Sequence, residues 1–408
     1  MDQVCVVGLG YIGLPTALML AAYGVPVIGV DYNKELVQTL KEGKTTFEEE
    51  GLDELFRKAI ETGITFTSDY VSTPVYIVAV PTPYDENSKK IDPSYVLAAV
   101  RDVMEACPED AIIVIESTVS PGTIDRYIKP AVEQNKRETG KAVSLVHAPE
   151  RIIPGNMVYE LVHNSRTMGA DDQKIGERVK DIYSNFCKGN IVVTDIRTAE
   201  MTKVVENTFR DINIAFANEL AKICRQDNMD VYEIIRIANM HPRVNILQPG
   251  PGVGGHCISV DPWFLVGDYP SLSHLIHEAR KINDSMPAFV LERVFEIMKE
   301  TGLTDISRVG FYGITYKEDV DDVRESPTLQ LYKSMQQHLG GNVKFYDPMC
   351  KKIILPGQTF DFDEFLEDID LLVIMVGHTH IKHRLEKLGD KVVLDTRNVC
   401  ELPKCFRL

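Results

Sequence analysis

The fold is decided by the segment Val4-Cys5-Val6-Val7-Gly8-Leu9-Gly10-Tyr11-Ile12-Gly13, together with the later run Val27-Ile28-Gly29-Val30-Asp31. Short runs of β-branched residues predict buried strands, and the residues between Gly13 and Gly24 predict a helix. A strand, a glycine-rich turn, a helix and a second strand form a βαβ unit, whose two strands are parallel. The N-terminus therefore predicts an α/β protein built on a parallel sheet.

The glycines of this turn indicate a dinucleotide site. Gly8 makes the tight turn, Gly10 lets a pyrophosphate approach the backbone, and Gly13 lets the helix pack on the strand. The N-terminus of the helix presents N–H groups and a partial positive charge to the phosphates. Asp31 is placed to accept hydrogen bonds from a ribose and to repel a 2′-phosphate, so the expected cofactor is NAD rather than NADP. The residues expected to contact the cofactor here are Gly8, Gly10, Tyr11, Ile12, Gly13 and Asp31.

Alternation of strand and helix patterns continues along the chain and predicts its organisation. Strands are expected at residues 4–7, 27–30, 75–80, 112–116, 143–147, 191–193, 309–312, 343–346, 371–375 and 392–395. No Gly or Pro occurs between residues 198 and 225, where apolar residues recur at near-helical spacing, so a long, largely buried helix is expected there. Helices at 231–238 and 273–299 follow.

These elements predict two Rossmann-like, doubly wound α/β domains joined by a long central helix and an all-helical middle region. The predicted parts are residues 1–197, 198–304 and 305–408. Two such domains joined by one helix would form a cleft, which is a common place for ligands.

The bulk composition excludes several classes of protein. The formal net charge of −16 argues against a nucleic-acid partner, because phosphate binding needs clustered Lys and Arg. No run of 18 apolar residues suggests a membrane span, and a cytoplasmic protein is expected. The eight cysteines form no C-x-x-C pair, which favours neither a zinc site nor a disulfide framework. No metal site is expected, and the cluster of His378, His380 and His383 is interpreted as a polar helix start.

A second glycine-rich segment lies between the predicted helices. It reads Pro249-Gly250-Pro251-Gly252-Val253-Gly254-Gly255-His256-Cys257, and Asp261 follows it. Glycine density of this kind lets backbone N–H groups approach an anionic ligand, and Cys257 stands where a substrate could meet it. A cysteine by itself is more often a small core residue, so this segment alone leaves both interpretations open.

Further motifs occur in a distinctive order along the chain. They are Gly8 to Gly13, Val80-Pro81-Thr82-Pro83, Glu116-Ser117-Thr118, Pro149-Glu150, Lys203 with Asn207, Gly254-Gly255-His256-Cys257 with Asp261, and Gly313-Ile314-Thr315-Tyr316-Lys317 leading to Asp322-Val323-Arg324-Glu325-Ser326-Pro327. In residues and order the chain resembles the UDP-sugar 6-dehydrogenases over essentially its whole length. The segment from His241 to Phe264 is most similar to the branch that acts on UDP-N-acetyl-D-mannosamine.

The resemblance implies a four-electron oxidation of a sugar C6 alcohol. A first hydride transfer to NAD would give an aldehyde, which the Cys257 thiolate would capture as a thiohemiacetal. A second hydride transfer would leave a thioester, and water would cleave it to a uronate. The product, UDP-N-acetyl-D-mannosaminuronate, would serve surface polysaccharide synthesis.

The resemblance also implies roles for polar side chains. Lys203 and Asn207 lie one turn apart on a helix, share one face, and would orient a water and stabilise the developing oxyanion. Asp261 would position Lys203 or the hydrolytic water, and Thr118 and Glu150 would close the catalytic site.

Binding residues are implied in the same way, because guanidinium and ammonium groups suit phosphate oxygens. Further cofactor contacts would be Pro81, Thr82, Thr118 and, from the C-terminal domain, Arg324. Substrate contacts would be Glu150, Arg151, Lys203, Asn207, Arg243, Asn245, Gly252, Gly254 and Lys317. In related enzymes an arginine near Arg243 enters the neighbouring subunit's site and the long helix is the dimer core, so a homodimer or larger assembly is expected.

One departure from the family bears on the substrate. The chain has Pro149-Glu150-Arg151-Ile152-Ile153-Pro154 where glucose-specific relatives carry Pro-Glu-Phe-Leu-Arg-Glu, so roles of the second glutamate cannot be carried over. Arg151 in place of an aromatic is hypothesised to suit a 2-acetamido sugar. The alternatives are UDP-N-acetyl-D-glucosamine or UDP-glucose as substrate. A two-electron dehydrogenase would have no use for Cys257, and a non-catalytic nucleotide-sensing protein would be marked by loss of the nucleophile, the lysine or the cofactor acid.

Overall fold

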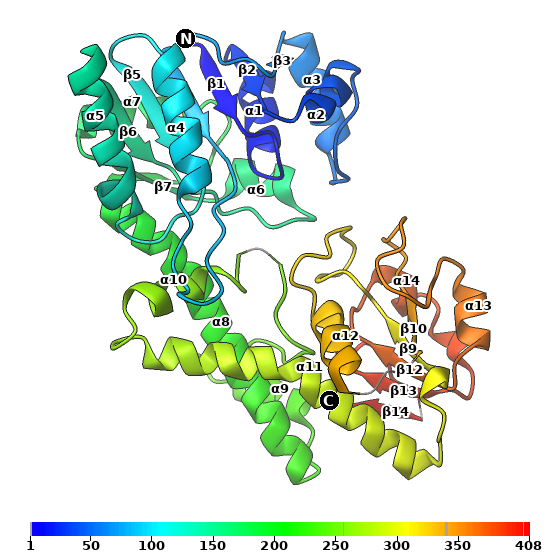
Figure 1. Ribbon diagram of the computed structural model, residues 1–408. Helices are drawn as coiled ribbons and strands as arrows, with labels where there is room; N and C mark the ends of the chain where they lie inside the picture. The colour runs from blue at the N-terminus through cyan, green and yellow to red at the C-terminus, as the bar shows by residue number, and fades with distance from the viewer. Residues whose placement is uncertain (1, 256, 339–341, 403) are drawn as a thin grey trace. The chain divides into compact units, whose positions relative to one another are not determined.

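The computed structural model describes residues 2–255, 257–338, 342–402 and 404–408. The chain divides into two compact units (Figure 1). Unit 1 comprises Met1–Glu206 and Trp263–Asp268, and unit 2 comprises Asn207–Pro262 and Tyr269–Leu408. Helix α8 (Ile196–Gln226) begins in unit 1 and ends in unit 2.

Unit 1 contains an eight-stranded sheet. Its strands are β1 (Val4–Val7), β2 (Val27–Val30), β3 (Thr65–Thr67), β4 (Val75–Val78), β5 (Ala111–Ile115), β6 (Val143–His147), β7 (Arg166–Ala170) and β8 (Ile191–Thr194). The spatial order is β3-β2-β1-β4-β5-β6-β7-β8, and only the β6 and β7 pair is antiparallel. The strand order reverses between β1 and β4, and such a switch point is where open α/β sheets bind ligands.

Helices cover both faces of this sheet (Figure 1). They are α1 (Gly13–Ala22), α2 (Lys34–Lys41), α3 (Leu52–Glu61), α4 (Ser94–Ala106), η1 (Ile124–Ile128), α5 (Lys129–Thr139), α6 (Met157–His163) and α7 (Gln173–Tyr183), and the end of α10 (Asp261–Asp268) also belongs to unit 1. Every residue of α1 is buried, because α1 packs on α3 and α6 as well as on the sheet. An apolar sequence on all sides of a helix is typical of such a position.

Unit 2 contains a six-stranded parallel sheet. Its strands are β9 (Val309–Tyr312), β10 (Lys344–Tyr346), β11 (Gln358–Thr359), β12 (Leu371–Ile374), β13 (Val392–Asp395) and β14 (Cys405–Arg407). Their order, β11-β10-β9-β12-β13-β14, repeats the pattern of the first six strands of unit 1, with a second switch point between β9 and β12. The prediction of two Rossmann-like, doubly wound sheets is confirmed.

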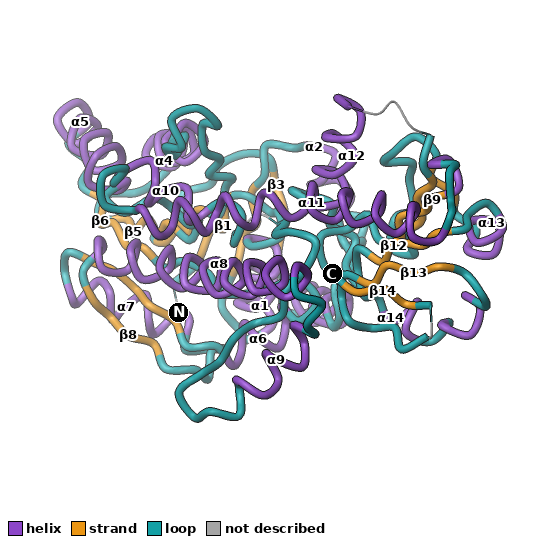
Figure 2. The backbone as a smooth tube through the Cα atoms, turned by 90° about the horizontal axis from the view of Figure 1, so that it is seen from below, coloured by secondary structure: helices purple, strands orange, loops and turns teal. Residues whose placement is uncertain are grey.

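The helical part of unit 2 shares a core with this sheet. Its helices are α9 (Val231–Ala238), α11 (His274–Thr301), η2 (Ile306–Arg308), α12 (Pro327–His338), α13 (Phe362–Glu367), α14 (Thr379–Lys382) and η3 (Leu385–Leu388). Figure 2 shows α11 running beside the C-terminal half of α8, and Asn218 and Lys222 of α8 bond to Asn283 and Ser285 of α11. Apolar residues of both helices join the sheet core.

Several elements differ from the expectation. Strands β3, β7, β11 and β14 were not predicted, because their short or polar sequences lack an apolar run. Helix α10 was not predicted either, because its apolar run Trp263-Phe264-Leu265-Val266 is too short to show a helical period. Within the chain the long helix is buried only in part: Val205, Phe216 and Ile223 are 47%, 48% and 51% exposed. Helical periodicity marks an apolar face but does not say what covers it. His378 precedes a helix as expected, yet it is fully buried.

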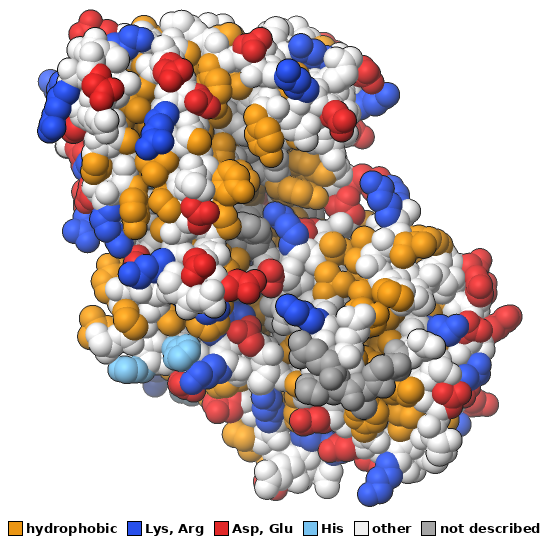
Figure 3. Space-filling model, in the orientation of Figure 1, with side chains coloured by type: hydrophobic (Ala, Val, Ile, Leu, Met, Phe, Trp, Pro, Cys, Tyr) orange, Lys and Arg blue, Asp and Glu red, His pale blue; other side chains and the backbone are white. Residues whose placement is uncertain are grey.

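The surface mixes charges of both signs over the face drawn in Figure 3. Among the residues that the structure describes, no helix is long and apolar enough to cross a bilayer. Within the same residues, no group of three or more His, Cys, Asp and Glu could hold a metal ion.

Candidate active site

The glycine turn after β1 leaves open space at one residue. Gly8 has a φ of 89°, and a Cβ on it would lie 2.7 Å from the Ala79 carbonyl oxygen. A Cβ on Gly13 would lie 1.8 Å from the Gly8 carbonyl oxygen, so α1 packs on β1 only with glycine there. A Cβ on Gly10 would meet nothing within 4 Å. The backbone at Gly10 is therefore open, which fits the approach of a pyrophosphate to the N-terminus of α1.

Asp31 is fixed beside this turn. Its Oδ2 accepts the Leu9 N–H at 2.8 Å, and its Oδ1 accepts the Asn33 N–H at 2.8 Å. The residue is 8% exposed, so it is held at the end of β2 with little freedom. An ionised carboxylate has further lone pairs with which to accept a ribose hydroxyl. Tyr11, the next predicted contact, stacks on Phe47 with ring centroids 4.3 Å apart.

The loops after β4 and β5 are tied together at the carboxyl end of the sheet. The Thr82 hydroxyl donates to the Thr118 carbonyl at 2.7 Å, and the Ser117 hydroxyl donates to the Val80 carbonyl at 2.6 Å. Pro81 is exposed, whereas Thr118 is half-buried. The structure thus brings Thr82 and Thr118, both predicted cofactor contacts, together next to the switch point.

Glu150 lies in a buried cluster that sequence reasoning missed. Its carboxylate pairs with the Arg166 guanidinium and accepts the Arg151 N–H at 2.6 Å. Arg166 also lies 3.6 Å from Glu116, which accepts the Tyr183 hydroxyl at 3.1 Å. Burial and the charge of Glu150 raise the pKa of Glu116 to about 8, and the Arg166 guanidinium opposes this shift. The ion pair with Arg166 and the bond from the Arg151 N–H therefore fix the position of the Glu150 side chain.

The Arg151 guanidinium is held inside unit 1. It lies 2.6 Å from the Glu206 carboxylate of α8 and donates to the Ser165 carbonyl at 2.8 Å and the Thr167 hydroxyl at 2.9 Å. Arg151 is predicted to contact the substrate, where its guanidinium could donate hydrogen bonds to phosphate oxygens. Its three contacts place its charge against α8, within one turn of Lys203.

Helix α8 carries the predicted lysine and asparagine on consecutive turns. Lys203, in unit 1, and Asn207, in unit 2, are 6% and 5% exposed. The Asn207 amide donates to the Asp261 carboxylate at 2.6 Å, which joins α8 to the first residue of α10. Because the amide nitrogen donates, its carbonyl oxygen is oriented away from Asp261. Two predicted catalytic residues are thus in direct contact.

Two asparagines of α8 hold the segment that leads into the glycine-rich loop. Asn213 accepts the Leu247 N–H at 2.9 Å and donates to the Asn245 carbonyl at 2.8 Å. Asn218 accepts the Gly250 N–H at 2.9 Å. These bonds satisfy backbone groups of an irregular segment, so this part of the loop has a defined path.

The second of these asparagines belongs to a larger buried network. Asn218 donates to Asn283 at 2.8 Å, Asn283 donates to the Asp211 carboxylate at 2.8 Å, and Arg280 donates to the same carboxylate at 2.6 Å. All four side chains are at most 2% exposed. Buried polar groups are costly unless they are paired, so this network rigidifies the support of Gly250.

Cys257 ends the glycine-rich loop in an exposed position. Its carbonyl accepts the Val260 N–H at 3.1 Å and the Asp261 N–H at 2.8 Å, so Cys257 begins the turn that opens α10. Six of the other seven cysteines are buried and Cys405 is half-buried. A thiol must be accessible to attack a substrate, and Cys257 meets this condition. His256, named in the motif, lies outside the described residues.

The glycine-rich loop packs on the loop after β9. The Gly255 N–H donates to the Arg324 carbonyl at 3.0 Å, and a Cβ on Gly254 would lie 2.6 Å from the Glu325 carbonyl oxygen. Gly252 has a φ of 137° and lies against Pro287. Predicted residues Gly252, Gly254 and Arg324 therefore meet in unit 2. The Arg324 side chain pairs with Asp322 at 2.7 Å.

Asp347 supports Lys317 much as Asp31 supports the first glycine turn. Its carboxylate accepts the N–H groups of Ile314 at 2.5 Å and Thr315 at 2.9 Å, and buried His378 lies 3.3 Å from it. Hydrogen bonds from His378 and from backbone N–H groups keep the pKa of Asp347 below its usual value despite burial. The Thr315 hydroxyl donates to the Lys317 carbonyl at 3.1 Å. In each sheet, therefore, an aspartate binds the loop of a neighbouring strand. Asp31, after β2, binds the loop after β1, and Asp347, after β10, binds the loop after β9.

The remaining predicted residues lie on the surface. Arg243 and Asn245 are exposed on the loop after α9.

Arg397, which sequence reasoning missed, follows β13 and lies close to Gly250. A Cβ on Gly250 would approach the Arg397 Nη1 to 2.7 Å. The signal that could have found it is its place just after a strand of the second parallel sheet.

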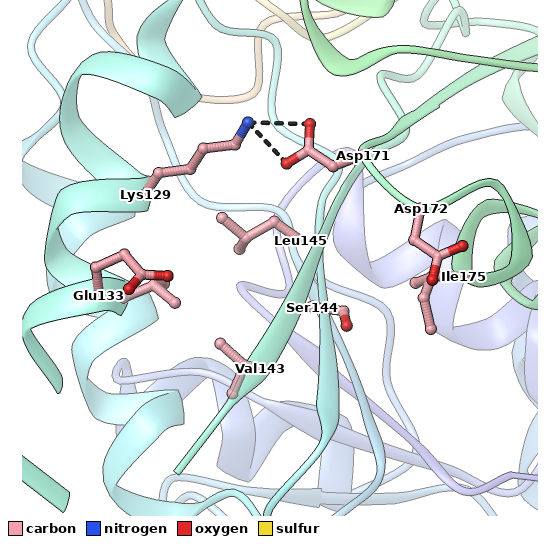
Figure 4. A pocket seen from close by; sticks show the side chains of 9 residues that line it. Lys129, Glu133, Val143, Ser144, Leu145, Asp171, Asp172 and Ile175 are labelled. Atoms are coloured by element: carbon pink, nitrogen blue, oxygen red, sulfur yellow. Dashed lines mark hydrogen bonds and ion pairs between the residues drawn. The ribbon is translucent and has the colours of Figure 1, made fainter. Parts of the chain in front are cut away.

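A cavity of about 270 Å³ in unit 1 is separate from these residues (Figure 4). It lies among α5, β6 and α7 and is lined by Lys129, Val132, Glu133, Val143, Ser144, Leu145, Asp171, Asp172 and Ile175. Lys129 is already paired with Asp125 and Asp171, each at 2.7 Å. None of the predicted site residues lines this cavity, so it is not the candidate active site.

Comparison with protein families matches the chain in three consecutive parts. Residues 2–187 match the NAD binding domain, residues 197–285 the central domain, and residues 310–402 the UDP binding domain of the UDP-glucose/GDP-mannose dehydrogenase family. The chain belongs to this family. It is an NAD-dependent UDP-sugar 6-dehydrogenase, and the predicted cofactor and class of enzyme are confirmed.

Individual members of the UDP-glucose/GDP-mannose dehydrogenase family are similar over nearly the whole chain. A UDP-N-acetyl-D-mannosamine dehydrogenase of Methanococcus aeolicus is 42% identical, covering 97% of this chain and 91% of its own. An NDP-N-acetyl-D-galactosaminuronic acid dehydrogenase of Ralstonia nicotianae is 39% identical, covering 97% and 96%. The solved UDP-D-ManNAc dehydrogenase of Pyrococcus horikoshii superposes with a TM-score of 0.91 at 34% identity, covering 99% and 98%.

Proposed function

We propose that the enzyme oxidises the C6 alcohol of UDP-N-acetyl-D-mannosamine to the carboxylate. The observation that carries this proposal is the exposed Cys257 at a turn whose last residue, Asp261, is hydrogen-bonded to Asn207. The same arrangement is what a four-electron oxidation through a thioester requires. Similarity to mannosamine dehydrogenases supports the choice of sugar.

The sulfur of Cys257 performs the covalent steps. When bound, NAD would supply the hydride acceptor: one molecule for the alcohol and, after exchange of the NADH formed, a second molecule for the thiohemiacetal. The Cys257 thiolate attacks the aldehyde carbon, forming a C–S bond and an alkoxide that takes up a proton. After the second oxidation a water attacks the thioester carbonyl, the C–S bond breaks, and the carboxylate and the thiolate are released. The enzyme thereby retains the reactive aldehyde until the second oxidation.

Asp261, Asn207 and Lys203 handle charge and protons. The Asn207 bond orients the Asp261 carboxylate, which is 3% exposed and is suited to accept a proton from the attacking water. Lys203 supplies a positive charge for the oxyanion at C6, where a buried ammonium acts more strongly than one in water. Thr118 and Glu150, which follow parallel strands of unit 1, stay predicted catalytic residues.

Binding of the nucleotide sugar is assigned to the two glycine-containing loops of unit 2 and to cations. Backbone N–H groups around Gly252 and Gly254, with Lys317 and Arg397, suit the charged UDP moiety. Arg151 is assigned to the 2-acetamido group, and its ion pair with Glu206 would hold the guanidinium in a set direction. Arg243 and Asn245 stay predicted substrate contacts, and an arginine near Arg243 is expected to enter the site of a neighbouring subunit.

A homodimer or larger assembly built on α8 is part of the proposal. Phe209, Phe216 and Ile223 recur every seven residues on one face of α8 in unit 2 and are 66%, 48% and 51% exposed. A row of apolar side chains at this spacing suits packing against a second helix. Sedimentation of Phe216→Asp should show a smaller species than the wild type, whereas Phe360→Asp, an exposed phenylalanine elsewhere, should not. An unchanged assembly in Phe216→Asp would contradict this interface.

The division into residues 1–197, 198–304 and 305–408 follows the order of the three matched family domains, and its boundaries stay a prediction. A cytoplasmic location is proposed because free thiols suit a reducing compartment.

The test is NADH formation with UDP-N-acetyl-D-mannosamine, UDP-N-acetyl-D-glucosamine, UDP-glucose and UDP-galactose. Two NADH per sugar and a preference for the mannosamine compound are expected. Cys257→Ser should stop multiple turnover, while Cys405→Ser, the half-buried cysteine, should keep it. Preference for UDP-N-acetyl-D-glucosamine would establish the runner-up substrate, and normal uronate output from Cys257→Ser would refute the covalent route.

A further inference from the structure

The loop that carries Thr118 is tied to helix α8 by a buried glutamate outside the predicted site. Glu200 accepts the Gly122 N–H at 2.5 Å through Oε2 and the Ile124 N–H at 2.9 Å through Oε1. Its exposure is 0%, and all three residues belong to unit 1. One carboxylate of α8 therefore binds two backbone groups of the segment that leads from β5 into η1.

The Glu200 carboxylate acts as an N-cap for η1, although Glu200 is far from η1 in the sequence. The first N–H groups of a helix lack partners within it, and Thr123, which precedes η1, makes no side-chain cap. A carboxylate is a strong acceptor for such groups, since bonds to a charged acceptor exceed neutral ones. A local Ser or Asp would satisfy the helix equally well, but it would not join the loop to α8.

A second acid holds the same segment from the other side. Asp268, at the end of α10 in unit 1, accepts the Ser120 hydroxyl and pairs with Arg126 at 3.0 Å. Gly122 adopts a φ of 85°, so the chain turns sharply between the two ties. With the Thr118 carbonyl bonded to Thr82, the loop is held at both ends.

Burial of Glu200 makes its charged form less favourable. Desolvation raises the pKa of Glu200 to about 7, against the two backbone bonds that favour its charged form. Asp125 and Arg126 are the other charged groups that act on it. A buried acid of this kind is a poor choice for stability alone. On α8 it precedes Lys203 by one turn.

We propose that Glu200 is a positioning residue for Thr118, holding the loop after β5 at a fixed place against the turn of α8 that bears Lys203. This inference rests on the proposed function, in which Thr118 and Lys203 serve the same reaction. Glu200 itself touches neither substrate nor cofactor in this scheme. Its effect on turnover therefore passes through Thr118.

The test is a double-mutant cycle between Glu200 and Thr118. Glu200→Gln keeps the shape but turns an NH₂ group toward one of the two backbone donors. It should lower kcat at least tenfold while KM for the UDP-sugar changes less than threefold. In a Thr118→Ala background the same substitution should lower kcat less than threefold. Equal effects in the two backgrounds would overturn the proposal, because a merely structural role is independent of Thr118.

Two further variants keep the test decisive. Glu200→Asp keeps the charge but retracts the carboxylate by one methylene, and it should show the same dependence on Thr118 if the Gln variant does not fold. Asp172→Asn alters a carboxylate that accepts a backbone N–H at the start of α7, and it should stay within twofold of the wild type.

Amide hydrogen exchange separates this inference from the proposed function. The Gly122 and Ile124 amides should exchange at least tenfold faster in Glu200→Gln than in the wild type, whatever the sugar specificity. Unchanged exchange would overturn the tie itself. A wild-type enzyme that forms no NADH with any UDP-sugar would instead defeat the proposed function and leave the exchange result interpretable.

Discussion

Gly10 and Gly13 stand three residues apart in one turn, and the structure assigns them different tasks. A Cβ on Gly10 meets nothing within 4 Å, whereas a Cβ on Gly13 would lie 1.8 Å from the Gly8 carbonyl oxygen. Real Cβ atoms essentially never approach closer than 3.0 Å, so Gly13→Ala must displace the backbone by about 1.2 Å (3.0 − 1.8). Overpacking of this kind costs about 1–3 kcal/mol of folding free energy.

Gly10→Ala should separate binding from folding. Its free energy of unfolding should be unchanged or higher by up to about 1 kcal/mol, because alanine restricts the unfolded chain. The added methyl occupies the space assigned to the pyrophosphate, so the Kd for NAD should rise at least tenfold, or about 1.4 kcal/mol.

Thermal unfolding and calorimetric titration with NAD measure both quantities. At roughly 2–4 °C per kcal/mol for a unit of this size, Gly13→Ala should lower the Tm by several degrees and Gly10→Ala should not. Wild-type NAD affinity in Gly10→Ala would refute the placement of the phosphates. Wild-type stability in Gly13→Ala would refute the packing argument.

Three other substitutions probe the cofactor acid, a buried histidine and the support of the glycine-rich loop. Asp31→Asn removes the charge that repels a 2′-phosphate, so the ratio of kcat/KM for NAD to that for NADP should fall at least tenfold; an unchanged ratio contradicts the assignment. Burial lowers the pKa of His147 from 6.5 to about 4, and its Nδ1 lies 2.9 Å from the Ile115 carbonyl oxygen. Between pH 6.5 and about 4, His147 is protonated in the unfolded chain but not in the folded one. The free energy of unfolding should therefore fall by up to about 3 kcal/mol as the pH is lowered through this range. His147→Gln should reduce this pH dependence in denaturant titrations. Asn218→Ala leaves the Gly250 N–H unpaired, which should cost about 1–3 kcal/mol in unfolding experiments and lower kcat; full activity at reduced stability would limit Asn218 to a structural role.

Most of unit 1 could be predicted because its signals are local. Four-residue apolar runs such as Val4–Val7 and Val27–Val30 become strands with the predicted bounds, and the glycine spacing between them needs no distant partner. Strand β7 escaped prediction because Arg166–Ala170 has no apolar run, and its burial comes from pairing with β6 and β8. The Pro149-Glu150 motif likewise predicts Glu150 but gives no sign of its partner Arg166. Arg166 lies on β7 and comes close to Glu150 because β7 pairs with β6.

By itself the sequence determined the two strand-turn-helix units, the residue types at each strand end and the cofactor class. These depend on spacing along the chain, and neighbours in sequence remain neighbours after folding. Tertiary structure alone decided that Glu200 binds the loop after β5, that Asn218 holds Gly250, and that Phe216 lies exposed on α8. Each is a contact, or a missing contact, between segments far apart in the chain, and side-chain periodicity carries no record of which distant backbone group a buried acid or amide will meet.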